Sequence, residues 1–295
     1  MRNAFIDELT TLATSNPRIA LIVGDLGYSV VEPFADSFPD RFLNAGVSEQ
    51  NMTGLAAGMA SEGYHVFTYS IANFPTFRCA EQIRNDVDYH KLPVTVVAVG
   101  GGLSYGALGY SHHAVQDYAL IRCMPNMLIA SPGDPLETRA CIRYLASNPS
   151  PSYLRLGKAG EPEFHTEIPE ITPGHWLPVA AGDENSGVAL LSTGATLGIA
   201  MQRRKNTAGP KPAVYSLPIW GMAFKEQQGE QVSHHANVIT FEDHLHDAGF
   251  GSWLMESVRN SPEMLNRIDN EALNSRVCGT VGSQNTLNAW GGLLA

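Results

Sequence analysis

The stretch RFLNAGVSEQNMTGLAAGMASEGYHVFTYSIANFPTFRCAEQIR, residues 41–84, says more about fold and function than any other part of the chain. A short apolar strand is followed by Glu49 at the start of a predicted helix, where the helix dipole favours a negative charge. After the next strand, Phe74 and Phe77 form a potential aromatic floor. A carboxyl group beside an aromatic slot suits a planar heterocyclic cofactor. Small helix residues would let a flat ligand or another backbone approach closely: Gly54, Ala56, Ala57, Gly58 and Ala60.

Length and composition indicate a globular protein of two domains. The 295 residues are 44% hydrophobic and 16% charged, which is enough for two cores. The formal net charge of −10, with no cluster of Lys and Arg to offset it, argues against nucleic acid as a partner. No apolar run approaches the roughly 20 residues that cross a bilayer. The N-terminal segment carries acids where a signal peptide needs an apolar core, so we expect a cytoplasmic protein.

The cysteines and a histidine pair in the last third offer little chemistry. The four cysteines show no C-x-x-C spacing, so we expect reduced, partly buried thiols rather than disulfides or zinc ligands. His244 and His246, in EDHLHDAGFG, are candidate metal ligands, but polar contacts within a loop are the favoured interpretation. The cysteines are Cys79, Cys123, Cys141 and Cys278.

The alternation of apolar strands and helical segments predicts the α/β class, with two domains that each contain a mostly parallel sheet flanked by helices. We place the domains at 1–160 and 186–295, joined by a linker over 161–185 that is rich in Pro, Gly and Glu. Function in such sheets lies beyond the carboxyl ends of the strands. The predicted strands are 19–23, 65–70, 94–99, 127–130, 188–193, 213–217 and 237–243. The predicted helices are 2–15, one from about 48, 76–90 and one over 249–258.

The Gly-rich loop at 101–122, GGLSYGALGYSHHAVQDYALIR, carries two adjacent histidines, His112 and His113. Its glycines permit backbone conformations closed to other residues and a close approach to a ligand. A histidine there can act as a general acid or base near neutral pH. A surface turn with one capping histidine is the alternative. Taken singly, a helix-terminal charge is the favoured interpretation of Glu49, and ordinary core packing is the favoured interpretation of the two phenylalanines.

In combination, these segments resemble the transketolase family of thiamine diphosphate enzymes. RFLNAGVSEQNMTGLAAGMASEGYHVF is similar to the family's pyrimidine-binding domain, with Glu49 in the place of its cofactor-binding glutamate. The similarity continues through NFPTFRCAEQIRNDV, SHHAVQDYALIRCMPNM, SPGDPLE and YLRLGK. It returns in VITFEDHLHDAGFGSWLMES, which is similar to the family's carboxyl-terminal domain. The resemblance covers nearly the whole chain and implies these two domains in this order.

The resemblance also implies roles for individual residues. Glu49 and His112 are the expected catalytic residues: the glutamate hydrogen-bonds a pyrimidine nitrogen of thiamine diphosphate, a task that burial favours, and the histidine lies near the hydroxyl groups of the sugar donor. The expected cofactor-binding residues are Asp25, Glu49, Ile71, Phe74 and Phe77. The expected substrate-binding residues are Arg2, Ser29, His112 and Lys158, with Arg2 and Lys158 holding a sugar phosphate.

By the same resemblance, this chain is the second subunit of a split transketolase. The family's diphosphate and Mg²⁺ site has a G-D-G…N motif, whereas here Gly24 and Asp25 are followed by Leu26. We therefore expect a partner subunit that carries this site, a two-plus-two heterotetramer and no metal ligand on this chain. The expected reaction moves a two-carbon ketol unit from a ketose or ketose phosphate donor to an aldehyde acceptor.

Departures from the family pattern keep other interpretations open. Leu108 replaces an acidic residue of the family's D-G-P-T-H loop, and Gly100 or Gly101 replaces a family histidine. With Tyr110, these changes suggest a sugar that is modified, deoxygenated or nucleotide-linked at that end. The alternatives are a beta-type subunit of a 2-oxo acid dehydrogenase, an enzyme similar to deoxyxylulose phosphate synthase, and a non-catalytic paralogue that binds a partner.

Overall fold

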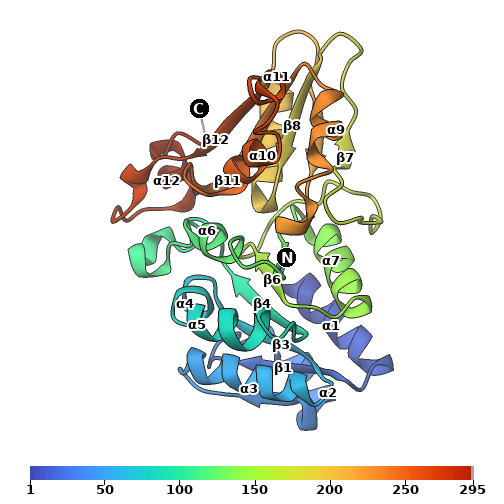
Figure 1. Ribbon diagram of the computed structural model, residues 1–295. Helices are drawn as coiled ribbons and strands as arrows, with labels where there is room; N and C mark the ends of the chain where they lie inside the picture. The colour runs from blue at the N-terminus through green and yellow to red at the C-terminus, as the bar shows by residue number, and fades with distance from the viewer. Residues whose placement is uncertain (294–295) are drawn as a thin grey trace.

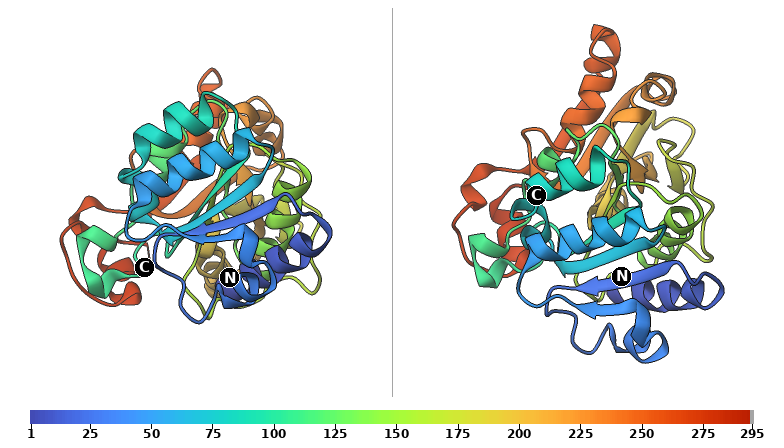
Figure 2. Two further views of the ribbon diagram at one scale, coloured as in Figure 1. Left: turned by 90° about the horizontal axis from the view of Figure 1, so that it is seen from below. Right: turned by 60° about the horizontal axis from the view of Figure 1, so that its bottom comes forward.

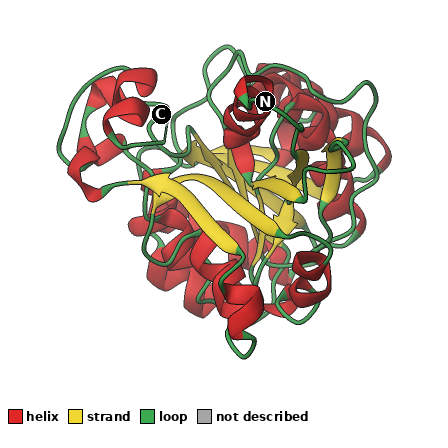
Figure 3. Ribbon diagram, turned by 90° about the horizontal axis from the view of Figure 1, so that it is seen from above, coloured by secondary structure: helices red, strands yellow, loops and turns green. Residues whose placement is uncertain are grey.

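A computed structural model describes residues 1–293 and has an α/β fold with two mixed, mostly parallel sheets flanked by helices (Figures 1 and 3). The first sheet has seven strands in the order β10-β5-β6-β4-β3-β1-β2. The second has five, in the order β12-β11-β8-β9-β7. Among the described strands, only β10 and β7 pair antiparallel with their neighbours. The predicted fold class is confirmed.

The first sheet is built mainly from the N-terminal half of the chain. Its strands are β1 (Ile19–Val23), β2 (Phe42–Asn44), β3 (His65–Ile71), β4 (Val94–Val99), β5 (Leu128–Ala130), β6 (Ser152–Leu156) and β10 (Ile219–Trp220). Its α-helices are α1 (Arg2–Ser15), α2 (Glu32–Ser37), α3 (Glu49–Ser61), α4 (Asn73–Phe77), α5 (Ala80–Gln82), α6 (Asp117–Ile121) and α7 (Pro135–Ser147). Short 3₁₀ turns cover Pro39–Arg41, Gly106–Leu108 and Tyr110–His112, and a π-helix covers Ile83–Asp88.

The second sheet carries the rest of the chain. Its strands are β7 (Leu177–Ala180), β8 (Val188–Ser192), β9 (Ala213–Ser216), β11 (Asn237–Leu245) and β12 (Ile268–Leu273). Its α-helices are α8 (Leu197–Asn206), α9 (Gln228–Ser233), α10 (Phe250–Ser257), α11 (Pro262–Leu265) and α12 (Gln284–Trp290). Short 3₁₀ turns cover Gly194–Thr196, Met222–Phe224 and Ser275–Val277.

Helices on opposite faces bury both sides of the first sheet, as Figure 2 shows for α3 and α1. Successive strand residues point to opposite faces. In β1, Ala20 and Ile22 therefore pack with Met52 of α3, while Ile19 and Leu21 belong to the cluster that includes α1. This two-sided burial explains the continuous apolar run at 19–23. It also fixes the carboxyl end of β1 beside the beginning of α3.

Several elements differ from the sequence expectation. The single helix expected over 76–90 is broken into α4, α5 and the π-helix, and Arg78 lies at the first break, where it pairs with Glu49. The segment expected to be a linker contains β7, which pairs with β9 in the second sheet. Strand β6 and helix α7 were not predicted. The predicted strands at 19–23 and 94–99 and the helix at 2–15 are confirmed.

The two parts of the chain are joined by more than the connecting segment. Strand β10 comes from the C-terminal half but pairs with β5 at the edge of the first sheet, through Ile219–Ala130 and Trp220–Ile129. Trp220 is fully buried, and its ring lies 5.2 Å from that of Tyr118 and 5.3 Å from that of Trp253, centroid to centroid. The first sheet is thus completed by the second half of the chain.

Two general expectations can also be compared with the structure. All four cysteines are free, and Cys79 and Cys141 are buried. Across residues 1–293, no helix has the length and apolar character that a membrane span requires.

Candidate active site

Glu49 lies where two elements of the first domain meet. It is the first residue of α3, after Ser48 at the N-cap, and its side chain is 3% exposed. Gly24, just after β1, packs beside it: a Cβ there would lie 3.7 Å from the Glu49 Cγ. A buried carboxylate requires a charge partner or hydrogen bonds. Arg78 supplies one, since its Nη1 donates to the Glu49 Oε2 at 2.9 Å.

Arg78 continues this contact to an aromatic pair. Its guanidinium carbon lies 4.2 Å from the centroid of the Phe74 ring, a cation–π geometry. The Phe74 ring in turn meets the His112 ring edge-on, with centroids 5.0 Å apart. The Asn73 side-chain amide donates to the Ser111 carbonyl at 2.8 Å and so ties α4 to the loop of His112. The structure therefore brings together side chains of α3, α4 and the Gly-rich loop.

His112 is the member of the histidine pair that reaches this group. It is half-buried, and burial lowers its pKa, with smaller contributions in the same direction from the charges of His113 and Arg78. The imidazole is therefore neutral near pH 7 and can accept a proton. His113 is 1% exposed, and its Nε2 faces the Gly106 carbonyl oxygen at 3.3 Å. Of the two histidines, His113 supports the loop.

An open cavity of about 590 Å³ gives access to Glu49. Its lining residues come from the N-terminal turn of α3, the loop before it and the break after α4: Val47, Ser48, Glu49, Gln50, Asn51 and Arg78. The buried carboxylate thus lies at the wall of a space that a small heterocycle can enter.

A second polar cluster surrounds Tyr105. The Lys158 Nζ lies 5.2 Å from the centroid of the Tyr105 ring, and the Tyr105 and His112 rings are 6.4 Å apart. Arg2 lies near the hydroxyls of Tyr69 and Tyr105: burial raises the pKa of both phenols, to about 12 for Tyr69, and the Arg2 charge opposes this. The Nε of Arg2 is buried without a hydrogen-bond partner within the described chain. The cluster offers two cations and two phenols near His112.

The loop after β1 is held in a strained conformation. Asp25 and Ser29 have φ angles of 56° and 62°, which non-glycine residues rarely adopt and which recur at functional sites. The pKa of Asp25 is lowered by hydrogen bonds, first from the Asn44 amide and then from the Tyr28 hydroxyl. The Ser29 backbone N–H donates to the Glu32 carboxylate at 2.7 Å. These bonds fix the loop next to Gly24, and hence near Glu49.

The two remaining expected cofactor residues are less enclosed. Ile71 is half-buried at the end of β3, directly before α4. Phe77 is 44% exposed at the end of α4. In the single chain, Phe74 therefore provides the aromatic surface beside Glu49, and Phe77 does not form a buried floor with it.

Sequence reasoning missed two residues of this site, Arg78 and Tyr105. Arg78 follows Phe74 by four positions, and side chains at i and i+4 of a helix are neighbours. That spacing was the available signal. Tyr105 packs on Gly100, whose φ is +82° and where a Cβ would come within 2.1 Å of the ring. A glycine forced by an aromatic neighbour leaves no distinct sequence pattern.

Two other places fit a catalytic site less well. Asp134, Glu137 and His165 bring possible metal-ligand atoms within 4.8 Å of one another. Each carboxylate oxygen, however, already has a hydrogen-bond partner: Asp134 accepts backbone N–H groups, and Glu137 contacts His165, Gly133 and the Ser216 hydroxyl. His165 is held by the Glu137 carboxylate, and this bond raises the pKa of the imidazole. The group is a hydrogen-bonded junction between the two halves of the chain.

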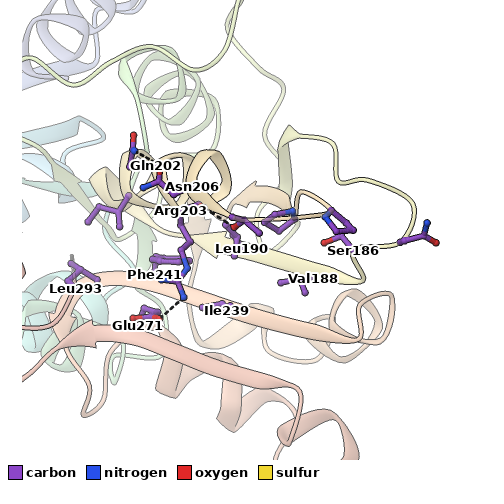
Figure 4. Close-up of a pocket in the computed structure, with 15 residues that line it drawn as sticks. Ser186, Val188, Leu190, Gln202, Arg203, Asn206, Ile239, Phe241, Glu271 and Leu293 are labelled. Atoms are coloured by element: carbon purple, nitrogen blue, oxygen red, sulfur yellow. Dashed lines mark hydrogen bonds and ion pairs between the residues drawn. The ribbon is translucent and has the colours of Figure 1, made fainter. Parts of the chain in front are cut away.

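The other place is a cavity of about 770 Å³ in the second domain, shown in Figure 4. Its floor is the apolar face of β8 and β11, with Leu190, Ile239 and Phe241, and α8 forms a wall. Arg203 and Glu271 lie 3.9 Å apart across it. Apart from this ion pair, its described lining is apolar or uncharged, so it offers no acid–base pair for catalysis.

His244, one of the two histidines considered as metal ligands, has both ring nitrogens in hydrogen bonds. They face the Leu245 carbonyl and the Ala119 N–H, so neither is free to bind a metal.

Comparison with known proteins identifies the family. The family model for the pyrimidine-binding domain of transketolase matches residues 1–160, more than half of the chain. The chain belongs to the transketolase family. This agrees with the resemblance inferred from the sequence.

Individual members of the transketolase family show which section the chain matches. It is 30% identical over 269 residues to one subunit of the apulose-4-phosphate transketolase of Phocaeicola vulgatus, covering 88% of this chain and 84% of that protein. It is 31% identical over 267 residues to a putative transketolase C-terminal section of Methanocaldococcus jannaschii, covering 88% and 82%. A solved structure of a split-gene transketolase, described as an inactive beta4 tetramer, matches with a TM-score of 0.84 and 29% identity, covering 99% and 93%. The similarity is to the C-terminal subunit of split transketolases, as expected.

Proposed function

We propose that this chain is the subunit of a thiamine diphosphate-dependent split transketolase that binds the pyrimidine end of the cofactor. Together with a partner subunit that carries the diphosphate and Mg²⁺ site, it transfers a two-carbon ketol unit from a ketose or ketose phosphate to an aldehyde. Residues 1–160 form the pyrimidine-binding domain in this proposal, and 186–295 the C-terminal domain. The observation that carries it is that Glu49 lines an open cavity and is linked through Arg78 to Phe74, whose ring contacts His112.

The side chains present fit an aminopyrimidine ring. Glu49 is a buried carboxyl group at the cavity wall, able to hold a proton between itself and a ring nitrogen. Phe74 offers the flat face on which such a ring stacks. When bound, thiamine diphosphate supplies the carbanion chemistry, and the protein supplies binding, orientation and electrostatics. In this division of work Asp25 and Ile71 border the ring and Phe77 extends the aromatic surface towards the partner subunit.

His112 and the cluster around Tyr105 are assigned to the sugar. The neutral imidazole of His112 accepts or returns a proton at a hydroxyl of the donor. Arg2 and Lys158, both near Tyr105, hold a terminal phosphate or other anion, and Ser29 is assigned to the same substrate. The buried, unpartnered Nε of Arg2 is a donor that an anionic ligand would satisfy.

The choice of sugar is tied to the exposed loop before His112. Leu108 and Tyr110 are 56% and 47% exposed there. Apolar side chains at a site that reads hydroxyl groups favour a sugar with fewer or altered hydroxyls. We therefore propose a substrate that differs from the common pentose phosphates at this end.

Cofactor binding tests the function most directly. The full chain, alone and mixed with its candidate partner, is titrated with thiamine diphosphate and Mg²⁺ in a calorimeter. We expect binding only with the partner, followed by ketol transfer from a ketose but not by oxidation or condensation of pyruvate. Tight binding by the chain alone would contradict the split site. Absence of binding in both cases would contradict the proposed enzymatic function and favour the non-catalytic paralogue.

A further inference from the structure

Arg78 makes two contacts that converge on the proposed pyrimidine site. Its Nη1 donates to the Glu49 carboxylate at 2.9 Å, and its guanidinium lies over the Phe74 ring at 4.2 Å from the centroid. The same side chain lines the cavity that opens on Glu49. Arg78 thus bridges the carboxylate and the aromatic face from inside the space that leads to them.

We infer that Arg78 is a gate: its guanidinium takes the place that the cofactor's pyrimidine needs, and it must leave Glu49 before the heterocycle can bind. This inference rests on the proposed function, since it concerns the same site. The guanidinium is planar, presents N–H donors to a carboxylate and stacks on aromatic rings. An aminopyrimidine that hydrogen-bonds Glu49 and stacks on Phe74 makes the same two contacts.

For steric reasons, the Arg78 guanidinium and the pyrimidine ring cannot occupy this site at the same time. Stacked aromatic rings lie about 4.5–7 Å apart between centroids, and the guanidinium carbon already lies 4.2 Å above Phe74. A second planar group cannot enter between them. A ligand's access to Glu49 is similarly restricted, because the carboxylate is 3% exposed and lies at the cavity that Arg78 also lines.

The position of Arg78 allows it to move. Its side chain is 50% exposed, and it directly follows the five-residue helix α4, at the break before α5. Rotation of the long side chain towards solvent requires no unfolding of an element. The charge pair costs little to break on the arginine side, since solvent replaces the lost contacts there. On the glutamate side, the entering heterocycle replaces the donor.

The test compares cofactor affinity between variants. Arg78→Gln removes the charge and the guanidinium plane, so the full chain assembled with its partner should bind thiamine diphosphate with Mg²⁺ about tenfold more tightly than the wild type, because no ion pair has to break. Arg84→Gln is the matched control: Arg84 is exposed on the adjoining π-helix, and its side chain bonds only to Asn85 among the described residues. It should leave the affinity unchanged.

A double-mutant cycle identifies the contact. In a Glu49→Gln background the ion pair is already absent, so Arg78→Gln should add little further affinity. Arg78→Lys keeps a cation but has no plane to stack on Phe74, and should give an intermediate gain. Thermal unfolding of each variant checks that the fold is intact, and the lysine variant serves if the glutamine variant does not fold.

The outcomes separate this inference from the proposed function. If the wild-type assembly binds the cofactor and neither Arg78 variant binds it more tightly, the gate is wrong and the function stands. Weaker binding by Arg78→Gln would instead make Arg78 a cofactor-binding residue. If wild type and variants alike fail to bind, the proposed function falls and the gate falls with it.

Discussion

Glu49 concentrates the proposed chemistry in one carboxyl group. Replacing it with Gln keeps the size of the side chain but removes the charge and the shared proton. Because positioned acid–base groups contribute about 10²–10⁴-fold, we expect Glu49→Gln to lower ketol transfer by the assembled enzyme at least 100-fold. The measurement is the kcat of transfer, with circular dichroism to confirm the fold. Glu62→Gln, exposed at the end of the same helix, is the control. Transfer at near the wild-type rate in Glu49→Gln would refute the catalytic role.

The lowered pKa of His65 predicts how the free energy of unfolding depends on pH. Its Nε2 lies 2.8 Å from the Thr95 hydroxyl, and burial lowers its pKa to about 4 from 6.5. The unfolded chain therefore binds a proton that the folded chain rejects between these pH values. Stability is unaffected above pH 6.5 and falls as pH drops towards 4, by about 3 kcal/mol in total.

The corresponding experiment is urea unfolding at pH 7.5 and at pH 4.5. His65→Gln should reduce the loss of unfolding free energy between the two pH values, because its amide does not titrate. His175→Gln, at an exposed position, should retain the wild-type loss. An equal loss in both variants would mean that other groups dominate.

At the scale of residues, the sequence was most informative where chemistry and position coincide. Glu49 and His112 are assigned from their places in a known pattern, and the structure adds their contacts with Arg78 and Phe74. Arg78 has one local signal, its i+4 spacing from Phe74, but its ion pair with Glu49 spans 29 positions in the chain. Long-range pairs of this kind leave no local period.

At the scale of elements, the C-terminal segment braces the loop that carries His112. Figure 1 shows this segment beside the loop. Leu287 of α12 is 1% exposed and packs with Leu103 and Val115 from the two ends of the loop. It also lies against Gly106, where a Cβ would be 2.6 Å from its Cδ1. The Gly282 N–H donates to the Gly106 carbonyl at 3.3 Å. The second domain thus has a part in shaping the proposed site.

Leu287→Ala should therefore affect stability and transfer together. Truncation of a buried leucine costs about 2–5 kcal/mol, and the loosened loop should raise the KM for the ketose donor. The melting temperature and the steady-state constants of the assembled enzyme measure the two effects. Leu265→Ala, at a position 36% exposed in α11, should change neither by much. A stability loss with an unchanged KM would restrict Leu287 to a structural role.

Two of the predicted strands share one property. Strands at 19–23 and 94–99 are buried on both faces, so they are continuous apolar runs bounded by turn residues. Strand β12, with the sequence IDNEAL, is only partly buried and has no such run. Strand β10 has two residues and exists because β5 is there to pair with it. The helical segment departs from a regular α-helical period at Arg78 and again in the π-helix Ile83–Asp88.

At the scale of the whole molecule, a buried arginine joins the two domains. Arg155 of β6 is 3% exposed, and it pairs with Asp117, the first residue of α6, and with Asp243 of β11. Removal of one partner leaves buried charges uncompensated, so Arg155→Met should lower the unfolding free energy by about 3–5 kcal/mol. Chemical denaturation measures this change.

Arg139→Met provides the comparison for that variant. Arg139 is 28% exposed and pairs with the exposed Asp7 and with the buried Glu8. Glu8 keeps a second partner, Arg143, when Arg139 is replaced. The loss should therefore be close to the roughly 0–1 kcal/mol that a surface pair contributes. Equal losses in the two variants would show that burial of the Arg155 network brings no special coupling between the domains.

The pairing of β10 with β5 has a consequence during protein synthesis. The first six strands of the seven-stranded sheet leave the ribosome before residues 219–220 have been translated. Until then β5 presents an unpaired edge, and unpaired edges are templates for aggregation. Nascent chains that pause before residue 219 should therefore be the form most dependent on chaperones, and a ribosome profile with chaperone capture would locate that dependence just before this strand emerges.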